Sequence, residues 1–107
     1  MAEGSKPVVR AFAILELLVG HCMDGLSNSE IAEKLGLSRP AVSRDLAALV
    51  DAGLAEQLPS GRYTASPRFA GLCQAYQLGM STAADRLDRF QRRAEARAMQ
   101  LLPSNRY

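Results

Sequence analysis

Two arginines near the middle of the chain have the chemistry to recognise a nucleic acid. Arg39 and Arg44 both follow Ser38 closely, in a stretch with the pattern of a helix start. A guanidinium is planar and can donate to the O6 and N7 atoms of guanine together, or to a phosphate. The free backbone N–H groups and positive dipole of a helix start favour the same kinds of partner. The stretch therefore predicts binding of a base edge or a phosphate.

Groups suited to catalysis or metal binding are scarce. His21 is the single histidine and has no matched acid, and no glycine-rich phosphate loop is present. Zinc takes about four ligands, and His21 with Cys22 and Cys73 makes no convincing set. The two cysteines lie outside any Cys-x-x-Cys pair and are predicted to be buried, reduced thiols. We expect neither an enzyme nor a cofactor.

Length, composition and charge set the remaining bounds. The chain has 107 residues, 48% of them hydrophobic, which suits one domain with an appended helix. The apolar stretch 11–19 contains Glu16 and is too short for a membrane span. No signal peptide is evident, so we expect a soluble cytoplasmic protein. Residues 1–65 carry a net charge of −2 and residues 66–107 one of +4, so DNA binding by the first part requires a local basic patch.

The first predicted helix covers residues 7–22 and is apolar on two sides. Its predicted core face is formed by Val8, Ala11, Phe12, Ile14, Leu15, Leu18, Val19 and Cys22. Val9, Ala13 and Leu17 lie on the other side, and one small core cannot bury both. These three residues are predicted to face a second copy of the chain. The alternative is that they are scattered, exposed apolar residues of the ordinary kind.

Two shorter helices and a hairpin follow. Ser27 and Glu30 have the spacing of a capping box, and the helix that they open ends at Gly36. Ser38 caps the next helix, which ends at Gly53. Its inner face is predicted to contain Val42, Leu46, Leu49 and Val50. Extended runs at 54–58 and 62–64, separated by a Gly-containing turn, predict a β-hairpin.

Two further helices are predicted after the hairpin. The first runs from Pro67 to about Leu78, with Phe69, Leu72, Cys73 and Tyr76 inward, and Gly79 breaks it. The second runs from about Ser81 to Leu101, with an apolar face of Met80, Ala83, Leu87, Phe90, Ala94, Ala98 and Leu101. Beside that face lies a stripe of Arg86, Arg89, Arg93 and Arg97. We interpret this stripe as a solvated surface, the alternative being a helix that follows DNA phosphates.

This order of elements is typical of one architecture. Three helices and a two-stranded β-hairpin wing form a winged helix-turn-helix, here followed by one short and one long C-terminal helix in a mainly α fold. We expect an N-terminal arm at 1–6, the winged helix-turn-helix at 7–65, C-terminal dimerisation helices at 66–102 and a tail at 103–107.

Several short motifs carry a resemblance to a known family. They are RAFAIL at 10–15, GLS at 25–27, IAEKLGLS at 31–38, VSR at 42–44 and GRY at 61–63. Over about residues 7–78 the chain resembles the N-terminal DNA-binding domain of the IclR family of bacterial transcription regulators. The resemblance implies a dimer with residues 38–44 in the major groove and the wing at 60–62 on DNA. Asp45 departs from the family, which usually has an apolar residue there. The family's effector-binding domain has no counterpart after Leu78, so no small-molecule effector is expected.

The residues expected to contact DNA lie at the start of the helix that Ser27 opens, at the start of the helix that Ser38 opens, and at the turn of the hairpin. Arg39 and Arg44 read bases, Ala41 touches a thymine methyl, and Arg62 reaches a phosphate or the minor groove. The full predicted set is Ser27, Asn28, Ser38, Arg39, Pro40, Ala41, Ser43, Arg44, Ser60 and Arg62, with Lys6, Arg10 and Lys34 as weaker phosphate candidates. The set predicted for dimerisation is Val9, Ala13, Leu17, Leu87, Phe90, Ala94 and Leu101.

The sequence thus predicts a dimeric repressor that binds double-stranded DNA with sequence specificity, from a bacterium or a phage. The expected partners are DNA and a second copy of the chain, with no membrane, metal or small-molecule effector. The competing hypothesis is a winged-helix module that binds another protein, as an adaptor or inhibitor, without specific DNA binding. Salt dependence separates the two, because binding to DNA weakens steeply as salt rises.

Overall fold

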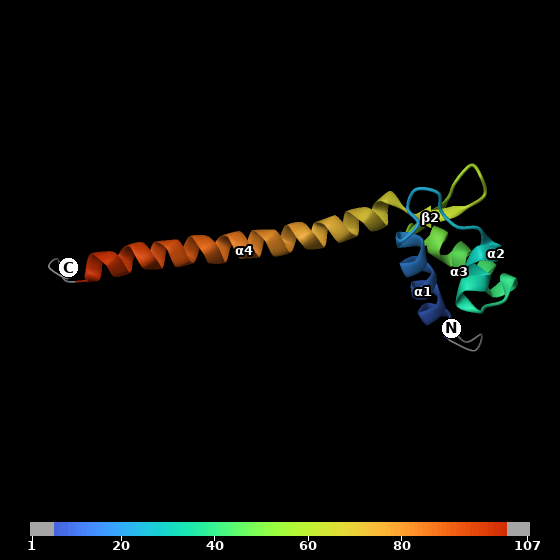
Figure 1. The fold of residues 1–107 in the computed structure, drawn as a ribbon, viewed down its shortest axis with the longest axis horizontal. Coiled ribbons are helices and arrows are strands. Elements are labelled where there is room, and N and C mark those ends of the chain that lie inside the picture. Colours follow the sequence, from blue (N-terminus) through green and yellow to red (C-terminus); the bar gives the residue numbers. More distant parts are fainter. Residues whose placement is uncertain (1–5, 103–107) are drawn as a thin grey trace. The chain divides into compact units, whose positions relative to one another are not determined.

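The computed structural model describes residues 6–102 of the chain (Figure 1). Its elements are α1 (Pro7–Val19), α2 (Asn28–Leu35), α3 (Arg39–Asp51), β1 (Ala55–Gln57), β2 (Tyr63–Ala65) and α4 (Pro67–Leu101). The chain divides into two compact units, one ending at Leu72 and the other beginning at Cys73. Three helices followed by a two-stranded antiparallel hairpin and a long helix confirm the predicted winged-helix fold.

The starts of α2 and α3 are fixed by side-chain caps. Ser27 Oγ accepts from the N–H of Glu30 at 3.1 Å, and Glu30 Oε1 accepts from the N–H of Ser27 at 2.9 Å. At α3, Ser38 Oγ accepts from the N–H of Ala41 at 3.3 Å. Each cap gives a partner to an N–H group that the helix itself cannot satisfy, and a cap stabilises by about 1 kcal/mol. Both predicted caps are confirmed.

A single apolar cluster joins the first three helices. Ile14 and Leu18 of α1, Ile31 of α2, and Val42 and Leu46 of α3 are its largest fully buried side chains. Burial of each such side chain stabilises the fold by about 2 kcal/mol. Leu15, Leu26, Leu37, Leu49 and Ala55 complete the cluster, so the hairpin and the helix connections share the same core.

The exposed side of α1 differs from the one predicted. Val8 is 67% exposed, Phe12 58% and Val19 47%, although all three were assigned to the core. Leu17, assigned to a dimer surface, instead packs against the core. When a helix has apolar residues on most of its sides, the sequence period does not show which side is buried. The neighbours of α1 cover the arc centred on Ile14 and Leu18, and an apolar stripe of Val8, Phe12 and Val19 remains exposed.

Three other burial predictions are wrong. Cys22 and Cys73 are exposed rather than buried. Val50 is exposed near the end of α3, one residue beyond the buried Leu49. Helix α1 ends at Val19, with Gly20 as its C-cap, so Cys22 lies in the connection after it rather than on its core face. The caps could be predicted from the local sequence, whereas the burial of a side chain depends on which distant parts of the chain pack against it.

The hairpin is tied to the connection between α1 and α2. Strands β1 and β2 pair antiparallel with Glu56 opposite Thr64. Leu26 adds a short bridge to Tyr63, with N···O distances of 2.9 Å and 2.8 Å. Gly25 makes this approach possible, because its φ is +72° and a Cβ there would lie 2.5 Å from the carbonyl oxygen of Tyr63. Strand β2 is therefore bonded on one side to β1 and on the other to the connection between α1 and α2.

Residues 67–101 form one helix rather than two. Ser66 Oγ accepts from the N–H of Phe69 at 3.1 Å at its start. Gly79 lies inside the helix, where a glycine costs about 1 kcal/mol relative to alanine. The Ala, Leu, Arg and Met residues on both sides favour helix strongly enough to carry it through. No residue of α4 is buried, so the predicted inward positions of Leu72, Cys73 and Tyr76 are wrong.

A buried ion pair joins α1 to α3 and accounts for the unusual residue Asp45. Arg10 Nε lies 2.9 Å from Asp45 Oδ2, and Arg10 Nη2 lies 3.4 Å from Oδ1. The side chains of Arg10 and Asp45 are only 11% and 6% exposed. The guanidinium binds both oxygens of the carboxylate and so neutralises the buried negative charge of Asp45. An apolar residue at position 45 would need no such partner. Arg10, a weak phosphate candidate, is thus held inside the fold.

Removing only the carboxylate should destabilise the protein. We expect Asp45→Ala to lower the free energy of unfolding by about 3 kcal/mol, because Arg10 stays largely buried without its counter-charge. The double variant Arg10→Met/Asp45→Leu should lie within about 1 kcal/mol of the wild type. Urea denaturation measures both. Asp51→Ala, which removes an exposed carboxylate from the same helix, is the control and should change stability by less than about 0.5 kcal/mol. Equal losses in Asp45→Ala and the double variant would contradict the account.

Candidate nucleic-acid interface

The turn between α2 and α3 determines which residues the recognition segment 38–44 exposes. Gly36 ends α2 with φ +67° and ψ +36°, a left-handed conformation that glycine adopts without strain. Leu37 then turns into the core, and its N–H donates to the carbonyl oxygen of Ala32 at 3.0 Å. Ser38 follows as the cap of α3. One face of the first turns of α3 is thereby left at the surface.

Four of the candidate contacts after the Ser38 cap are exposed. They are Arg39, Pro40, Ser43 and Arg44. Ala41 differs, because it is only 2% exposed and its methyl group has almost no surface to offer a thymine. The expected contact of Ala41 with a base therefore does not fit this arrangement. The exposed surface of the segment is formed by side chains at positions 39, 40, 43 and 44.

The start of α3 offers fewer backbone donors than its sequence suggests. Pro40 has no N–H group, and the N–H of Ala41 already donates to Ser38 Oγ. The start of α2 differs, because the N–H groups of Asn28 and Ser29 have no acceptor among the residues that the structure describes. Orphan N–H groups of this kind suit a phosphate oxygen. The geometry thus favours a phosphate at the start of α2 and side-chain contacts at the start of α3.

A polar cluster joins the starts of the two helices. Asn28 Nδ2 donates to Ser43 Oγ at 2.6 Å and to the carbonyl oxygen of Arg39 at 3.4 Å. The Arg39 guanidinium donates to Ser29 Oγ. Asn28 Oδ1 is buried and accepts no hydrogen bond from the described residues. Asn28, Arg39 and Ser43 therefore fix the position of α3 on α2, in addition to any contact with a ligand.

Arg44 differs from the other candidate arginines because its side chain is not bonded to any other part of the described fold. It is exposed, and its side chain makes no hydrogen bond and no ion pair with any residue in the range 6–102. A guanidinium with all five donors unused can bind a bidentate acceptor without breaking an internal contact first. Arg44 is consequently the candidate best suited to a base edge.

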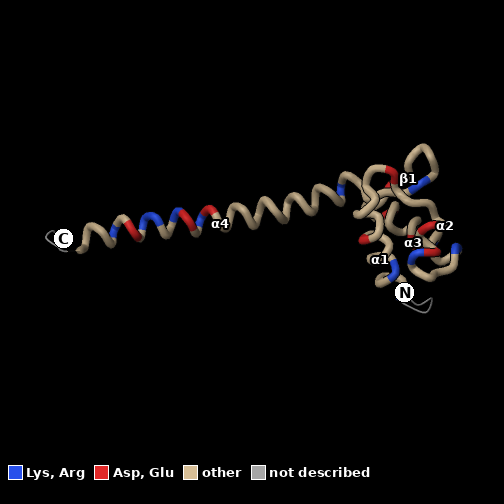
Figure 2. The backbone as a smooth tube through the Cα atoms, viewed as in Figure 1, with Lys and Arg blue, Asp and Glu red and all other residues tan. Residues whose placement is uncertain are grey.

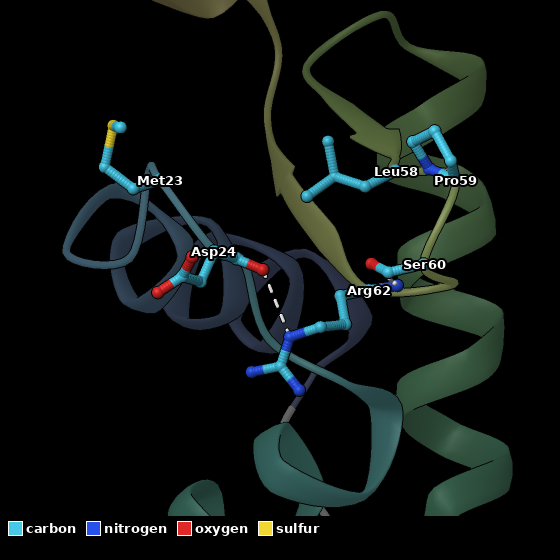
Figure 3. A pocket seen from close by; sticks show the side chains of 6 residues that line it. All are labelled: Met23, Asp24, Leu58, Pro59, Ser60 and Arg62. Atoms are coloured by element: carbon cyan, nitrogen blue, oxygen red, sulfur yellow. Dashed lines mark hydrogen bonds between the residues drawn. The ribbon is translucent and has the colours of Figure 1, made fainter.

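Arg62 on the wing is bonded to three residues in two other parts of the fold. Its Nε donates to the carbonyl oxygen of Asp24 at 3.1 Å, as Figure 3 shows, and its Nη2 donates to that of Gly25 at 3.1 Å. Nη2 also lies 2.8 Å from Glu30 Oε1. Arg62 thus links the wing to the α1–α2 connection and to the capping box of α2. Ser60, at the hairpin turn, is exposed, and its Oγ accepts from the N–H of Arg62 at 3.3 Å.

Glu30 is the carboxylate on which these contacts converge. The backbone N–H of Ser27 lowers the pKa of the Glu30 carboxyl most, and the Ser27 hydroxyl and the Arg62 guanidinium add to the effect. The sequence indicated Glu30 only as part of a capping box. Its partner Arg62 lies on another element, and no short-range pattern connects the two positions.

The remaining predicted contacts are surface residues or caps. Ser27 is half-buried and its hydroxyl is used by the capping box, while Lys34 is exposed near the end of α2. Charges of both signs are spread over the part of the chain up to Leu72, and over the C-terminal part of α4 (Figure 2). Among residues 6–102, no group of three or more His, Cys, Asp or Glu side chains could hold a metal ion. No helix in that range is long and apolar enough to cross a membrane.

An apolar groove lies along α1 in the first unit. Phe12, Leu15, Glu16 and Val19 of α1 line it together with Phe69. Four of these five side chains are apolar, and the groove includes two members of the exposed stripe on α1. This surface is a better candidate for contact with another protein than Val9, Ala13 and Leu17, of which Leu17 packs on the core.

Comparison with known proteins places the first unit in a family. Residues 7–59 match the IclR helix-turn-helix domain. The chain is also similar to the HTH-type transcriptional regulator Rv1719 of Mycobacterium tuberculosis, with 38% identity over 80 residues. The matched region covers 74% of this chain and 30% of that relative, so the chain spans less than a third of the length of the protein it resembles.

The lowered pKa of Glu30 predicts a pH dependence of stability. The ionised carboxylate stabilises the fold fully above its ordinary pKa of 4.5, and this contribution is lost as the pH falls through the lower, folded-state value. We therefore expect the difference in unfolding free energy between the wild type and Glu30→Gln to be constant above about pH 5.5. The difference should shrink as the pH falls below 4.5.

Urea denaturation at a series of pH values measures this difference. Glu33→Gln removes the neighbouring exposed carboxylate on the same helix, and its difference from the wild type should change less over the same range. A difference for Glu30→Gln that stays flat from pH 6 to pH 3 would show that the Ser27 and Arg62 contacts do not hold the carboxylate in solution.

Proposed function

Residues 7–59 are an IclR-type helix-turn-helix domain, and from this premise we propose that the protein is a sequence-specific, DNA-binding regulator of transcription. The observation that carries the proposal is the exposed start of α3 with the unengaged guanidinium of Arg44. The name of the mycobacterial relative, a transcriptional regulator, supports the same function.

In this proposal α3 enters the major groove and Arg44 reads a base. A guanidinium that bonds guanine O6 and N7 discriminates against other bases by about 1–3 kcal/mol. Pro40 and Ser43 are small exposed neighbours that let the helix approach the base edges closely. Arg39 already donates to Ser29 and is held toward α2 by that bond, so it ranks below Arg44.

Contacts to the DNA backbone come from the neighbouring elements. The orphan N–H groups of Asn28 and Ser29 bind a phosphate at the start of α2, with the Ser38 cap beside the groove. Ser60 at the wing turn is free to approach the next stretch of backbone. Arg62 acts first by holding the wing in place, through Asp24, Gly25 and Glu30.

We further propose that two copies bind together and repress transcription. Two recognition helices would read a partly palindromic site with half-sites about one helical turn apart. The exposed apolar residues Val8, Phe12 and Val19 of α1 leave surface for a second copy. Occupation of a promoter by such a dimer blocks polymerase, which is the simplest form of control.

Loss of the Arg44 side chain should remove sequence preference. We expect Arg44→Ala to lower the ratio of specific to non-specific affinity by about tenfold or more, because the guanidinium supplies base discrimination. Fluorescence anisotropy measures this with duplexes from the region upstream of the protein's own gene and with unrelated duplex. A salt series in the wild type should show affinity falling steeply as salt rises.

Arg68→Ala is the matched control, since it removes the same charge from an exposed residue that lies against Gly53. It should leave the ratio of specific to non-specific affinity unchanged. Equal effects of Arg44→Ala and Arg68→Ala would contradict base reading by Arg44. An absence of binding at low salt would contradict DNA binding altogether and favour a module that binds another protein.

A further inference from the structure

The part of α4 from residue 73 to residue 101 exposes a long apolar stripe with a regular period. Successive members of the stripe are three or four residues apart, with an average step of about 3.5 residues. The members are Cys73, Tyr76, Met80, Ala83, Leu87, Phe90, Ala94, Ala98 and Leu101. Tyr76 is 71% exposed, Phe90 67% and Leu101 72%. The alternation of three and four is regular over the three heptads from Cys73 to Ala94, which is the pattern of a left-handed coiled coil. Arg97 takes the next position of the series, with Ala98 beside it, and Leu101 continues the stripe.

We propose that residues 73–101 form a parallel, in-register coiled coil with the same residues of a second copy. This coiled coil rests on the dimer proposed above and adds to it a second contact, distinct from the exposed stripe of α1, with a defined orientation. It does not depend on DNA binding, because the stripe lies wholly in the second unit of the chain.

The charges beside the stripe favour a parallel pair. Arg86 and Arg93 flank one edge of the stripe, and Ala84 and Gln91 flank the other. In a parallel coiled coil the two different edges meet, so Arg86 lies near the partner's Gln91. In an antiparallel pair equal edges meet, and arginines of the two copies approach each other. Like charges in that position destabilise a pair, so the edges select the parallel orientation.

The exposed area is sufficient for a second copy. A fully covered aromatic side chain removes 150–250 Å² from water. At the exposures of Tyr76 and Phe90, the four rings of two copies supply on the order of 500 Å². Stable interfaces begin at about 1,200 Å² in total, and Met80, Leu87 and Leu101 of each copy add most of the remainder. A folded monomer would leave this whole stripe in water.

The position of Cys73 provides a direct test of orientation. In a parallel, in-register pair the two Cys73 residues face each other across the axis, within the Cα separation of about 4–7 Å that a disulfide spans. In an antiparallel pair they lie at opposite ends, separated by about 40 Å. Cys22→Ser leaves Cys73 as the single cysteine of the chain.

The experiment is mild oxidation of full-length Cys22→Ser protein with copper phenanthroline, without DNA, followed by non-reducing electrophoresis. We expect most of the protein to become a disulfide-linked dimer, which a reductant converts back to the monomer on the gel. The double variant Cys73→Ser/Cys22→Ser should form no cross-link. Sedimentation equilibrium on the reduced protein should show a dimer. A monomer at all concentrations, or a dimer without the Cys73 cross-link, would overturn the proposal.

A matched pair of substitutions distinguishes the stripe from the helix as a whole. Leu87→Glu places a charge on the stripe, whereas Met99→Glu places the same charge on an exposed apolar residue of the opposite side. We expect Leu87→Glu to raise the dimer Kd at least about 100-fold and to abolish the cross-link, since two leucines leave the interface. Met99→Glu should change neither, and equal effects of the two would overturn the proposal. Normal dimers that fail to bind DNA would count against the proposed function alone.

Discussion

The left-handed turn at Gly36 is the constraint on which the candidate interface depends. A residue with a Cβ would be strained by about 1–2 kcal/mol at this φ of +67°, and the turn leaves only Leu37 between it and the cap of α3. Leu37 is buried in the core while Ser38 starts the new helix, and Val42 and Leu46 join the same apolar cluster. The same rotation puts positions 39, 40, 43 and 44 on the surface. Core and recognition surface are thus opposite sides of one helix whose direction is fixed at one residue.

The polar groups of this domain hold the fold together more than the sequence suggested. Arg10 pairs with the buried Asp45, Arg62 joins the wing to Glu30, and Arg39 donates to Ser29. Each contact connects two elements, so together they fix α1, α2, α3 and the hairpin around the core. Arg44 is the candidate arginine left without such a contact within the described residues. A domain with a net negative charge over residues 1–65 can then present positive charge where a base edge would lie.

Local chemistry made the caps and the hairpin predictable, and long-range packing made other features unpredictable. The Ser27–Glu30 box and the Ser38 cap depend on residues three positions apart, which a sequence displays directly. The buried arc of α1 depends on where other elements pack, and an apolar residue on nearly every side concealed it. Gly79 resembled a helix break because its cost is visible in sequence, while the summed helix preference of its neighbours is not. The pairs Arg10–Asp45 and Arg62–Glu30 join positions more than thirty residues apart, and neither followed from a local pattern.

Recognition of DNA by α3 is tested most sharply by selecting binding sites from a random library of duplex DNA and sequencing them. We expect the wild-type protein to enrich a partly palindromic motif with half-sites about ten base pairs apart. We expect Arg44→Ala to select a motif that has lost its preference for guanine at one position of each half-site. Enrichment of no motif by the wild type, or of an identical motif by Arg44→Ala, would contradict recognition of DNA through the exposed start of α3.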